Sequence, residues 1–239
     1  MSITMNPERC GNFTSSEIYR LLGTSKVAET YIHEKNLERK LGRCLSLEKS
    51  TRSMSWGHFM EKYVHENKLS MSYALMSDTT VLHPDVAYWA GSPDNVNKKE
   101  SVVGDTKCFE PKAFCEYVDC IIQNDIELFK KLFPKEYWQL VSNACILGMK
   151  FIEPIAYMPY LSEIPAIKKA AQEADPLDPW KFGFIVNGDI SELAYLPDGG
   201  YYKDLNIVRF EVPLADKKLL TEAVVKAGAH LIPRQSIAA

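Results

Sequence analysis

The chain has 239 residues, of which 46% are hydrophobic and 25% charged, and these values are typical of a globular protein that buries a core without crosslinks. This length fits a single domain over residues 1–239. The formal net charge of -3 excludes the strong overall basic excess of many nucleic-acid-binding domains, although it allows a local basic groove. No apolar stretch has the length of a membrane span or the pattern of a secretion signal, so we expect a cytoplasmic protein without membrane contact.

The first half of the sequence predicts helices followed by strands. Thr14-Ser15-Ser16 precedes a short amphipathic segment that ends at Gly23, which is typical of a capped helix. Apolar periodicity predicts further helices over residues 25–41 and 55–67. Residues 79–90 and 101–108 are rich in strand-forming residues, and the polar stretch 95–100 between them is expected to form the turn region.

The second half predicts a mixture of both element types. Helices are expected over residues 111–129, 134–147, 164–174 and 214–227, and strands over 151–160 and 207–212. Helices, then a small sheet, then helices packed on that sheet indicate an α/β or α+β layer fold. We therefore expect a small central mixed β-sheet flanked by helices.

The cysteines allow two interpretations. Six are present, at positions 10, 44, 108, 115, 120 and 145, and no CxxC motif occurs. The spacing of Cys44, Cys108, Cys115 and Cys120 matches no common iron–sulfur pattern. Buried or incidental reduced thiols are the main interpretation, and a metal cluster on these four cysteines is the alternative.

Basic residues outnumber acidic ones between Lys26 and Arg52. One interpretation is a DNA-binding surface that uses Lys26, Lys35, Arg39 and Lys40. The other is an ordinary solvated helix face, which the sequence supports equally well.

The most informative segment joins Gly91-Ser92-Pro93-Asp94 to Asp105-Thr106-Lys107. If the intervening residues form a turn, the flanking strands pair antiparallel and Asp94 falls opposite Asp105. Residues 105 and 107 are two apart, so their side chains project from the same face of a strand. Two carboxylates and one ammonium group are thus expected on one side of a sheet.

This combination suits the hydrolysis of phosphodiester bonds. Carboxylate oxygens bind hard cations such as Mg²⁺, which polarise the phosphoryl group and lower the pKa of a bound water. A neighbouring lysine can orient that water or neutralise the charge that develops. Glu61, on a helix before the sheet, is a third carboxylate; Gly57, one turn earlier, would let that helix approach another backbone closely. Gln139, on the helix after the sheet, offers an amide to a phosphate or a metal-bound water.

Taken in order, these motifs resemble a known superfamily. Gly57-x3-Glu61, Ser92-Pro93-Asp94, Asp105-x-Lys107 and the helix that carries Gln139 are similar to the motifs of PD-(D/E)xK nucleases. Within that superfamily the chain most resembles the YqaJ-type, lambda-exonuclease-like viral recombinases. The resemblance covers residues 13–160 and implies a restriction-endonuclease-like core, while residues 161–239 remain a C-terminal extension without an assigned role.

The resemblance implies specific roles and partners. Asp94 and Asp105 would be ligands of Mg²⁺, with two ions expected and Mn²⁺ as a substitute, Glu61 would bind the second ion or its water, and Lys107 would act on the nucleophile. Members of the family degrade one strand of linear duplex DNA from its 5′ end. They leave a 3′ single strand for an annealing protein, and some form ring-shaped trimers. We therefore expect a Mg²⁺-dependent 5′→3′ exonuclease of a phage or prophage recombination system.

Two departures from the family pattern keep alternatives open. Asp-x-Lys replaces the commoner Glu-x-Lys, and the arginine of the N-terminal helix motif is absent because Glu17 follows Ser16. Recognition of a 5′ phosphate would therefore need Arg20 or Lys26 as a substitute. The alternatives are an endonuclease or a nuclease of other polarity on the same core, or a non-catalytic DNA-binding or assembly protein.

Overall fold

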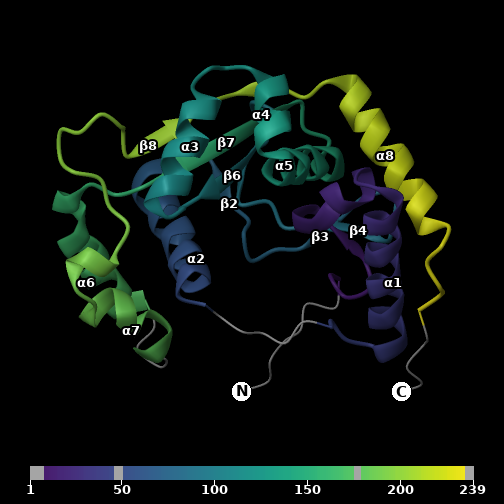
Figure 1. The fold of residues 1–239 in the computed structure, drawn as a ribbon, viewed down its shortest axis with the longest axis horizontal. Coiled ribbons are helices and arrows are strands. Elements are labelled where there is room, and N and C mark those ends of the chain that lie inside the picture. Colours follow the sequence, from purple (N-terminus) through teal and green to yellow (C-terminus); the bar gives the residue numbers. More distant parts are fainter. Residues whose placement is uncertain (1–7, 46–50, 175–178, 235–239) are drawn as a thin grey trace.

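The computed structural model describes residues 8–45, 51–174 and 179–234, and its centre is a mixed β-sheet. The strands lie in the order β2 (Ala74–Leu75), β5 (Asn95–Asn97), β6 (Val102–Lys107), β7 (Phe151–Tyr157) and β8 (Leu205–Ile207), and β9 (Phe210–Glu211) also pairs with β7 (Figure 1). The central pair β6–β7 is parallel, whereas the other pairs are antiparallel. The predicted small mixed sheet is therefore present.

Helices cover both faces of this sheet. One face packs against α3 (Pro111–Ile121), α4 (Ile126–Leu132) and α5 (Pro134–Leu147), and the other against α2 (Arg52–Val64), α6 (Ile164–Ala174) and α7 (Pro179–Asn187). Strand β7 shows why, because its side chains alternate between the two sides. Ile152 and Ala156 belong to the first hydrophobic cluster, and Ile155 and Tyr157 belong to the second.

A second, three-stranded sheet lies at the other end of the molecule from α6 and α7. Its strands lie in the order β1 (Phe13–Thr14), β4 (Trp89–Gly91) and β3 (Val81–Leu82). The helices beside this sheet are the 3₁₀ helix η1 (Ser15–Leu22), α1 (Ser25–Leu41) and α8 (Leu214–Gly228) (Figure 1). Short helical turns complete the described part of the chain: η2 (His65–Leu69), η3 (Leu161–Glu163) and η4 (Ile190–Glu192).

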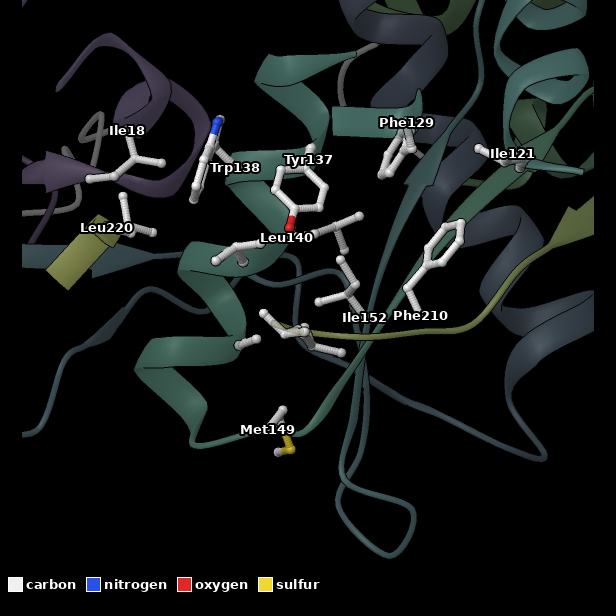
Figure 2. Close-up of a cluster of buried hydrophobic side chains, with 14 of the residues drawn as sticks. Ile18, Ile121, Phe129, Tyr137, Trp138, Leu140, Met149, Ile152, Phe210 and Leu220 are labelled. Atoms are coloured by element: carbon white, nitrogen blue, oxygen red, sulfur yellow. The ribbon is translucent and has the colours of Figure 1, made fainter. Parts of the chain in front are cut away.

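Helix α5 lies at the centre of the larger hydrophobic cluster. Figure 2 shows Tyr137, Trp138 and Leu140 of this helix among Ile152 of β7 and Phe210 of β9. The aromatic residues of α5 therefore pack in the core, and the C-terminal third supplies part of that core. Pro134 begins the helix, and Gly148 ends it in the left-handed conformation, at φ 66°.

Several predicted helices are observed with their predicted bounds, among them residues 25–41, 134–147 and 164–174. The predicted helix over residues 111–129 is wrong in one respect, since it is two helices. Asn124 adopts a positive φ of 53°, which ends regular helix. The side chain of Asp125 then accepts hydrogen bonds from the backbone N–H groups of Glu127 and Leu128, so it caps a new helix, α4.

The strand that pairs with β6 also differs from the prediction. Residues 79–90 were expected to pair with 101–108, but β5 (Asn95–Asn97) takes that place and β4 joins the second sheet. Pro93 lies in the chain between β4 and β5, and because it has no N–H group it interrupts the strand there. The turn is correspondingly shorter and ends at Ser101, whose φ is 58°. Among the described residues, no helix is long and apolar enough to cross a membrane.

Candidate active site

Asp94, Asp105 and Lys107 come together at the open end of the β5–β6 pair. Asn95 pairs with Gly104, so this register places Asp94 opposite Asp105, as the sequence predicts. Both carboxylates are buried, Asp105 completely. The ammonium of Lys107 lies 2.7 Å from Oδ2 of Asp105. Two negative groups and one positive group thus share one small region of the sheet.

Hydrogen bonds from the backbone and from α5 hold the two carboxylates in place. Oδ2 of Asp94 accepts a bond from the backbone N–H of Thr106 at 2.9 Å. Oδ1 of Asp105 accepts a bond from the side-chain amide of Gln139 at 2.7 Å. Gln139 therefore acts on Asp105 directly, since its amide nitrogen fixes the orientation of that carboxylate.

A polar network behind the carboxylates explains the neighbouring residues. Asn95 donates from its amide to Oγ1 of Thr106 at 2.8 Å, and its amide oxygen lies 3.0 Å from Nδ1 of His65. His65 is buried and follows α2 directly, so it connects that helix to the sheet. Its role is structural, whereas His58, one turn before Lys62 on α2, lines the cavity described next.

A cavity of about 240 Å³ opens onto this cluster. Glu61 from α2, Asp94 and Gln139 line it, and so do residues of the N-terminal segment and of the β4–β5 connection. Sequence reasoning alone does not determine where the helix that carries Glu61 points. The structure does, because the apolar side chains of α2 pack against the sheet and direct Glu61 toward the cavity.

The electrostatic environment raises the pKa of two of the carboxyl groups. Burial, together with the charges of Asp105 and Asp78, raises the pKa of Glu61 to about 7, although Lys107 and Lys62 oppose this shift. Burial, Asp105 and Glu61 raise the pKa of Asp94 well above its usual range. Acidic groups are thus crowded together in a poorly solvated place, which disfavours their charged forms.

The lysine responds in the opposite sense. Burial disfavours the charged form of Lys107, but the charges of Asp105 and Asp94 outweigh burial and raise the pKa of Lys107 above its ordinary value. Lys107 is consequently an ammonium ion at neutral pH. It neutralises part of the negative charge of the cluster and can donate hydrogen bonds to a neighbouring oxygen.

The donor set fits a hard divalent cation. All three acidic side chains offer oxygen, which Mg²⁺ and Mn²⁺ prefer, and one ammonium does not balance three carboxylates. Oδ2 of Asp105 is buried, and within the described ranges it makes no hydrogen bond other than its ion pair with Lys107. A divalent cation beside Asp94 and Asp105 would supply the missing positive charge, with Glu61 facing the same cavity.

The cavity also contains residues for which the sequence suggested no role in the site. Arg9 is exposed at its edge, and Ser15 and Ser16 reach it from the first turn of η1. Ser92 lines it from the motif that precedes Asp94. The Thr14-Ser15-Ser16 motif was a usable signal for this region, but no local pattern connects Arg9 with the site, because the contact depends on the path of the N-terminal segment.

Close packing beside the site depends on Gly91, not on Gly57. A Cβ atom at Gly91 would collide with the side chains of Ser15 and Asn143, so only glycine lets β4 approach η1 and α5. The prediction that Gly57 serves such an approach is wrong for the described part of the chain, where no neighbouring atom lies within 4 Å of a Cβ atom built at Gly57.

Three of the basic residues suggested for DNA binding have partners within the protein. Arg20 forms two hydrogen bonds with Glu34, at 2.6 and 2.9 Å, and stacks over Tyr31. Lys35 is buried and bonds to Glu38 at 3.0 Å. The guanidinium of Arg20 and the ammonium of Lys35 are therefore already paired with carboxylates of α1.

Arg39 likewise donates to the backbone oxygens of Gly11 and Ile232. Lys26 and Lys40 are exposed, so they are the two of the five suggested basic residues that face solvent. The interpretation of this helix as a basic DNA-binding face therefore applies to fewer residues than the sequence suggests.

The pKa of Glu61 predicts a pH dependence for the metal-free protein. Because the folded protein binds the Glu61 proton more tightly than the unfolded chain does, ionisation of Glu61 lowers the free energy of unfolding as pH rises from about 4.5 through about 7. We expect Glu61→Gln to remove this loss. The change that Glu61→Gln causes in the free energy of unfolding should therefore be more stabilising at pH 8 than at pH 5, by about 2 kcal/mol. Urea unfolding in EDTA at both pH values measures the difference. Glu116→Gln, on the exposed face of α3, is the control; an equal effect of Glu61→Gln at the two pH values would contradict the expectation.

Comparison with known proteins gives matches in structure. No protein-family model and no curated protein matches the sequence. The alkaline exonuclease LHK-Exo from Laribacter hongkongensis matches with a TM-score of 0.59 and 15% identity over 92% of this chain and 88% of that chain. The structure of LHK-Exo in complex with dAMP matches with a TM-score of 0.60 and 16% identity, over 95% of this chain and 91% of that chain.

A phage-related exonuclease from Haemophilus somnus 129PT matches with a TM-score of 0.62 and 10% identity, over 92% of both chains. These matches extend well beyond residues 13–160, so the C-terminal third belongs to the shared fold. The chain therefore has the fold of these exonucleases, which confirms the predicted fold class, a small central mixed β-sheet flanked by helices, and the predicted likeness in fold to phage-type exonucleases.

Proposed function

We propose that this chain is a Mg²⁺-dependent deoxyribonuclease that degrades linear duplex DNA from the 5′ end. The observation that carries the proposal is the cavity lined by Glu61 and Asp94, with Asp105 opposite Asp94 in the sheet and paired to Lys107. The likeness in fold to exonucleases supports the same activity. Asp94 and Asp105 would hold the metal, and Glu61 would hold a second ion or its water.

When bound, Mg²⁺ would polarise the scissile phosphate and lower the pKa of the attacking water. The protein's own groups then position the reactants. Lys107, held as an ammonium beside Asp105, orients the water and stabilises the negative charge that develops on the phosphate oxygens. Gln139 keeps Asp105 in one orientation through its 2.7 Å hydrogen bond, so that the carboxylate does not rotate away during the reaction.

The preference for a 5′ end would reside at the other side of the cavity. Arg9 offers a guanidinium group, which binds phosphate through paired hydrogen bonds. The first turn of η1, at Ser15 and Ser16, presents the positive end of a helix, which favours anions. Arg9 thereby takes the part for which the sequence suggested Arg20 or Lys26.

Arg9→Ala is expected to reduce the preference for 5′-phosphorylated over 5′-hydroxyl ends by roughly tenfold or more, since a charge-assisted hydrogen bond contributes about 1.5–3 kcal/mol. Initial rates on duplexes that differ only in this phosphate measure the preference. Arg43→Ala, in an exposed position after α1, is the matched control. If Arg9→Ala slows both substrates equally, Arg9 does not recognise the terminal phosphate.

The proposal as a whole is tested by comparing three DNA substrates with and without Mg²⁺. We expect linear duplex to lose a 5′-terminal label as mononucleotides and to lose a 3′-terminal label only late, while uniformly labelled covalently closed circles stay intact. Cleavage of the circles would indicate the alternative endonuclease, and early release of the 3′ label the opposite polarity. No cleavage of any substrate would favour a non-catalytic DNA-binding or assembly protein.

The same proposal includes two partners. The surviving 3′ strand would be passed to a single-strand annealing protein during phage or prophage recombination. A ring-shaped homotrimer would encircle the duplex and so allow processive digestion. Sedimentation equilibrium of the purified chain tests the trimer, and a monomer at concentrations that support full activity would contradict it.

A further inference from the structure

A second cluster of potential metal ligands lies away from the active site. One ligand atom from each of Cys10, Glu38 and Cys44 lies within 4.8 Å of the other two, and this is the only such group of three or more among the residues that the structure describes. Cys108, Cys115 and Cys120, the other members of the alternative four-cysteine cluster, do not join it. The thiols of Cys10 and Cys44 therefore lie beside the carboxylate of Glu38 and not beside those three cysteines.

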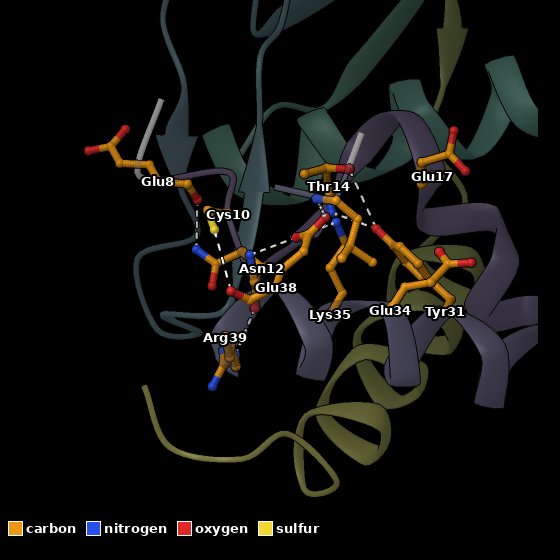
Figure 3. Close-up of polar contacts among 12 residues, drawn as sticks. Glu8, Cys10, Asn12, Thr14, Glu17, Tyr31, Glu34, Lys35, Glu38 and Arg39 are labelled. Carbon is orange, nitrogen blue, oxygen red and sulfur yellow. Dashed lines mark hydrogen bonds and ion pairs between the residues drawn. The ribbon is translucent and has the colours of Figure 1, made fainter. Parts of the chain in front are cut away.

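The cluster joins segments that are separate in the sequence, and Figure 3 shows two of its members, Cys10 and Glu38. Cys10 precedes β1, Glu38 lies in the last turn of α1, and Cys44 follows that helix. The C-terminal segment is attached at the same place, because Arg234 donates to the backbone oxygen of Cys10 at 2.7 Å. A ligand bound here would therefore crosslink parts of the chain that are distant in sequence.

The burial and hydrogen bonds of the Glu38 carboxylate suit a metal ligand. It is only 6% exposed, and its Oε2 atom accepts hydrogen bonds from the backbone N–H of Gly11 at 2.8 Å and from Nζ of Lys35 at 3.0 Å. Among the described residues, Oε1 has a single distant donor, the backbone N–H of Leu45 at 3.5 Å. Carboxylates that bind metals are commonly oriented in this way by hydrogen bonds to the oxygen that does not bind.

We propose that Cys10, Cys44 and Glu38 bind a Zn²⁺ ion, with solvent in the fourth position. Two sulfur atoms and one carboxylate oxygen suit zinc in tetrahedral geometry, whereas the all-oxygen set at Asp94 and Asp105 suits Mg²⁺. Binding deprotonates both thiols and releases two protons to solvent, so the bound ion and its three ligands carry a net charge of -1 beside the ammonium of Lys35.

The position of the site indicates what the ion would do. Arg9, at the edge of the active-site cavity, is the residue next to Cys10 in sequence. Arg39 of α1 already holds Gly11 through its backbone oxygen at 2.8 Å. The backbone N–H of Gly11 also donates to Glu38 of the same helix. Zinc would reinforce these connections between α1 and this segment, and would thereby fix the backbone from which Arg9 extends.

Cobalt substitution tests the proposal on the full-length reduced protein. Mg²⁺ is added in excess to occupy the oxygen site, and Co²⁺ is then titrated. We expect one equivalent of Co²⁺ to produce thiolate-to-cobalt charge-transfer absorption and the intense visible bands of tetrahedral cobalt, and Zn²⁺ to abolish both. Cys10→Ser and Cys44→Ser should each lose the charge-transfer absorption, while Cys115→Ser, a partly buried cysteine on α3, should retain it.

A further variant keeps the test valid if a cysteine variant fails to fold. Glu38→Gln retains both thiols and should weaken Co²⁺ binding by at least roughly tenfold, the lower bound for losing even an outer-shell partner of a ligand. Absence of thiolate absorption in the wild-type protein would overturn the proposal. So would absorption that persists in both cysteine variants, or a protein that is isolated with Cys10 and Cys44 joined by a disulfide and binds no Co²⁺ after reduction.

Discussion

Asp105→Asn is expected to abolish Mg²⁺-dependent cleavage of linear duplex DNA, with a loss of at least about 10³-fold in kcat. Asp105 is the central carboxylate of the site: it is fully buried, its Oδ2 faces Lys107 and its Oδ1 faces Gln139. Asparagine keeps the size of the side chain but removes the negative charge that would bind the metal. Since metal binding supplies several kcal/mol of transition-state stabilisation, a loss of this size follows.

The same substitution should leave the metal-free fold intact. The free energy of unfolding in EDTA should fall by no more than about 1 kcal/mol or should rise, because Asp94 and Glu61 still neutralise Lys107 and one crowded negative charge is gone. Asp85→Asn, in an exposed loop, is the control and should retain full activity. Near-wild-type cleavage by Asp105→Asn would contradict the assignment of the site, whereas a large loss of stability would make the variant uninformative about catalysis and would direct the test to Asp94→Asn.

Lys107→Ala is expected to lower kcat by about 10²–10⁴-fold, the range typical of groups that orient or deprotonate a nucleophile. The dissociation constant for DNA should change by only a few fold, because the cavity still contains its other polar groups. The reason lies in the position of Lys107: its ammonium lies 2.7 Å from Asp105 and so is directed at the site of reaction. Single-turnover rates at saturating enzyme, together with DNA binding in Ca²⁺, separate the two effects.

The matched control for Lys107 is Lys112→Ala, because Lys112 is highly exposed on α3 and pairs only with Glu116 on the same helix. This variant should leave both constants unchanged. If Lys107→Ala weakens DNA binding as much as it lowers turnover, Lys107 is a binding residue and another group must act on the nucleophile. Lys107→Met, which keeps the length of the side chain, distinguishes loss of charge from loss of packing.

The local part of the site could be predicted from sequence. Asp94, Asp105 and Lys107 lie within 14 consecutive residues, and the period of two along a strand determines which side chains share a face. The prediction that Asp94 lies opposite Asp105 is confirmed, although the strand that pairs with β6 is β5 and not residues 79–90. The hairpin itself, and not its neighbours, sets that register.

The basic residues show the limit of such reasoning. Lys35 and Arg39 are indistinguishable in sequence from exposed helix residues, yet Lys35 is buried and Arg39 bonds to the backbone oxygens of Gly11 and Ile232. The partners of a long charged side chain depend on which segments pack beside it. That packing involves residues nearly 200 positions away, which no local pattern encodes.

The amino-acid sequence by itself determined the helices with clear apolar periodicity, the class of fold, and the hairpin that carries two carboxylates and a lysine, because each depends on interactions between residues close in the chain. Only the tertiary structure decided that Glu61 faces the cavity, that Gln139 holds Asp105, and that Arg9 lies at the cavity edge. These placements arise when α2, α5 and the N-terminal segment bury their apolar faces against the two sheets, and such long-range packing is settled by the whole chain at once.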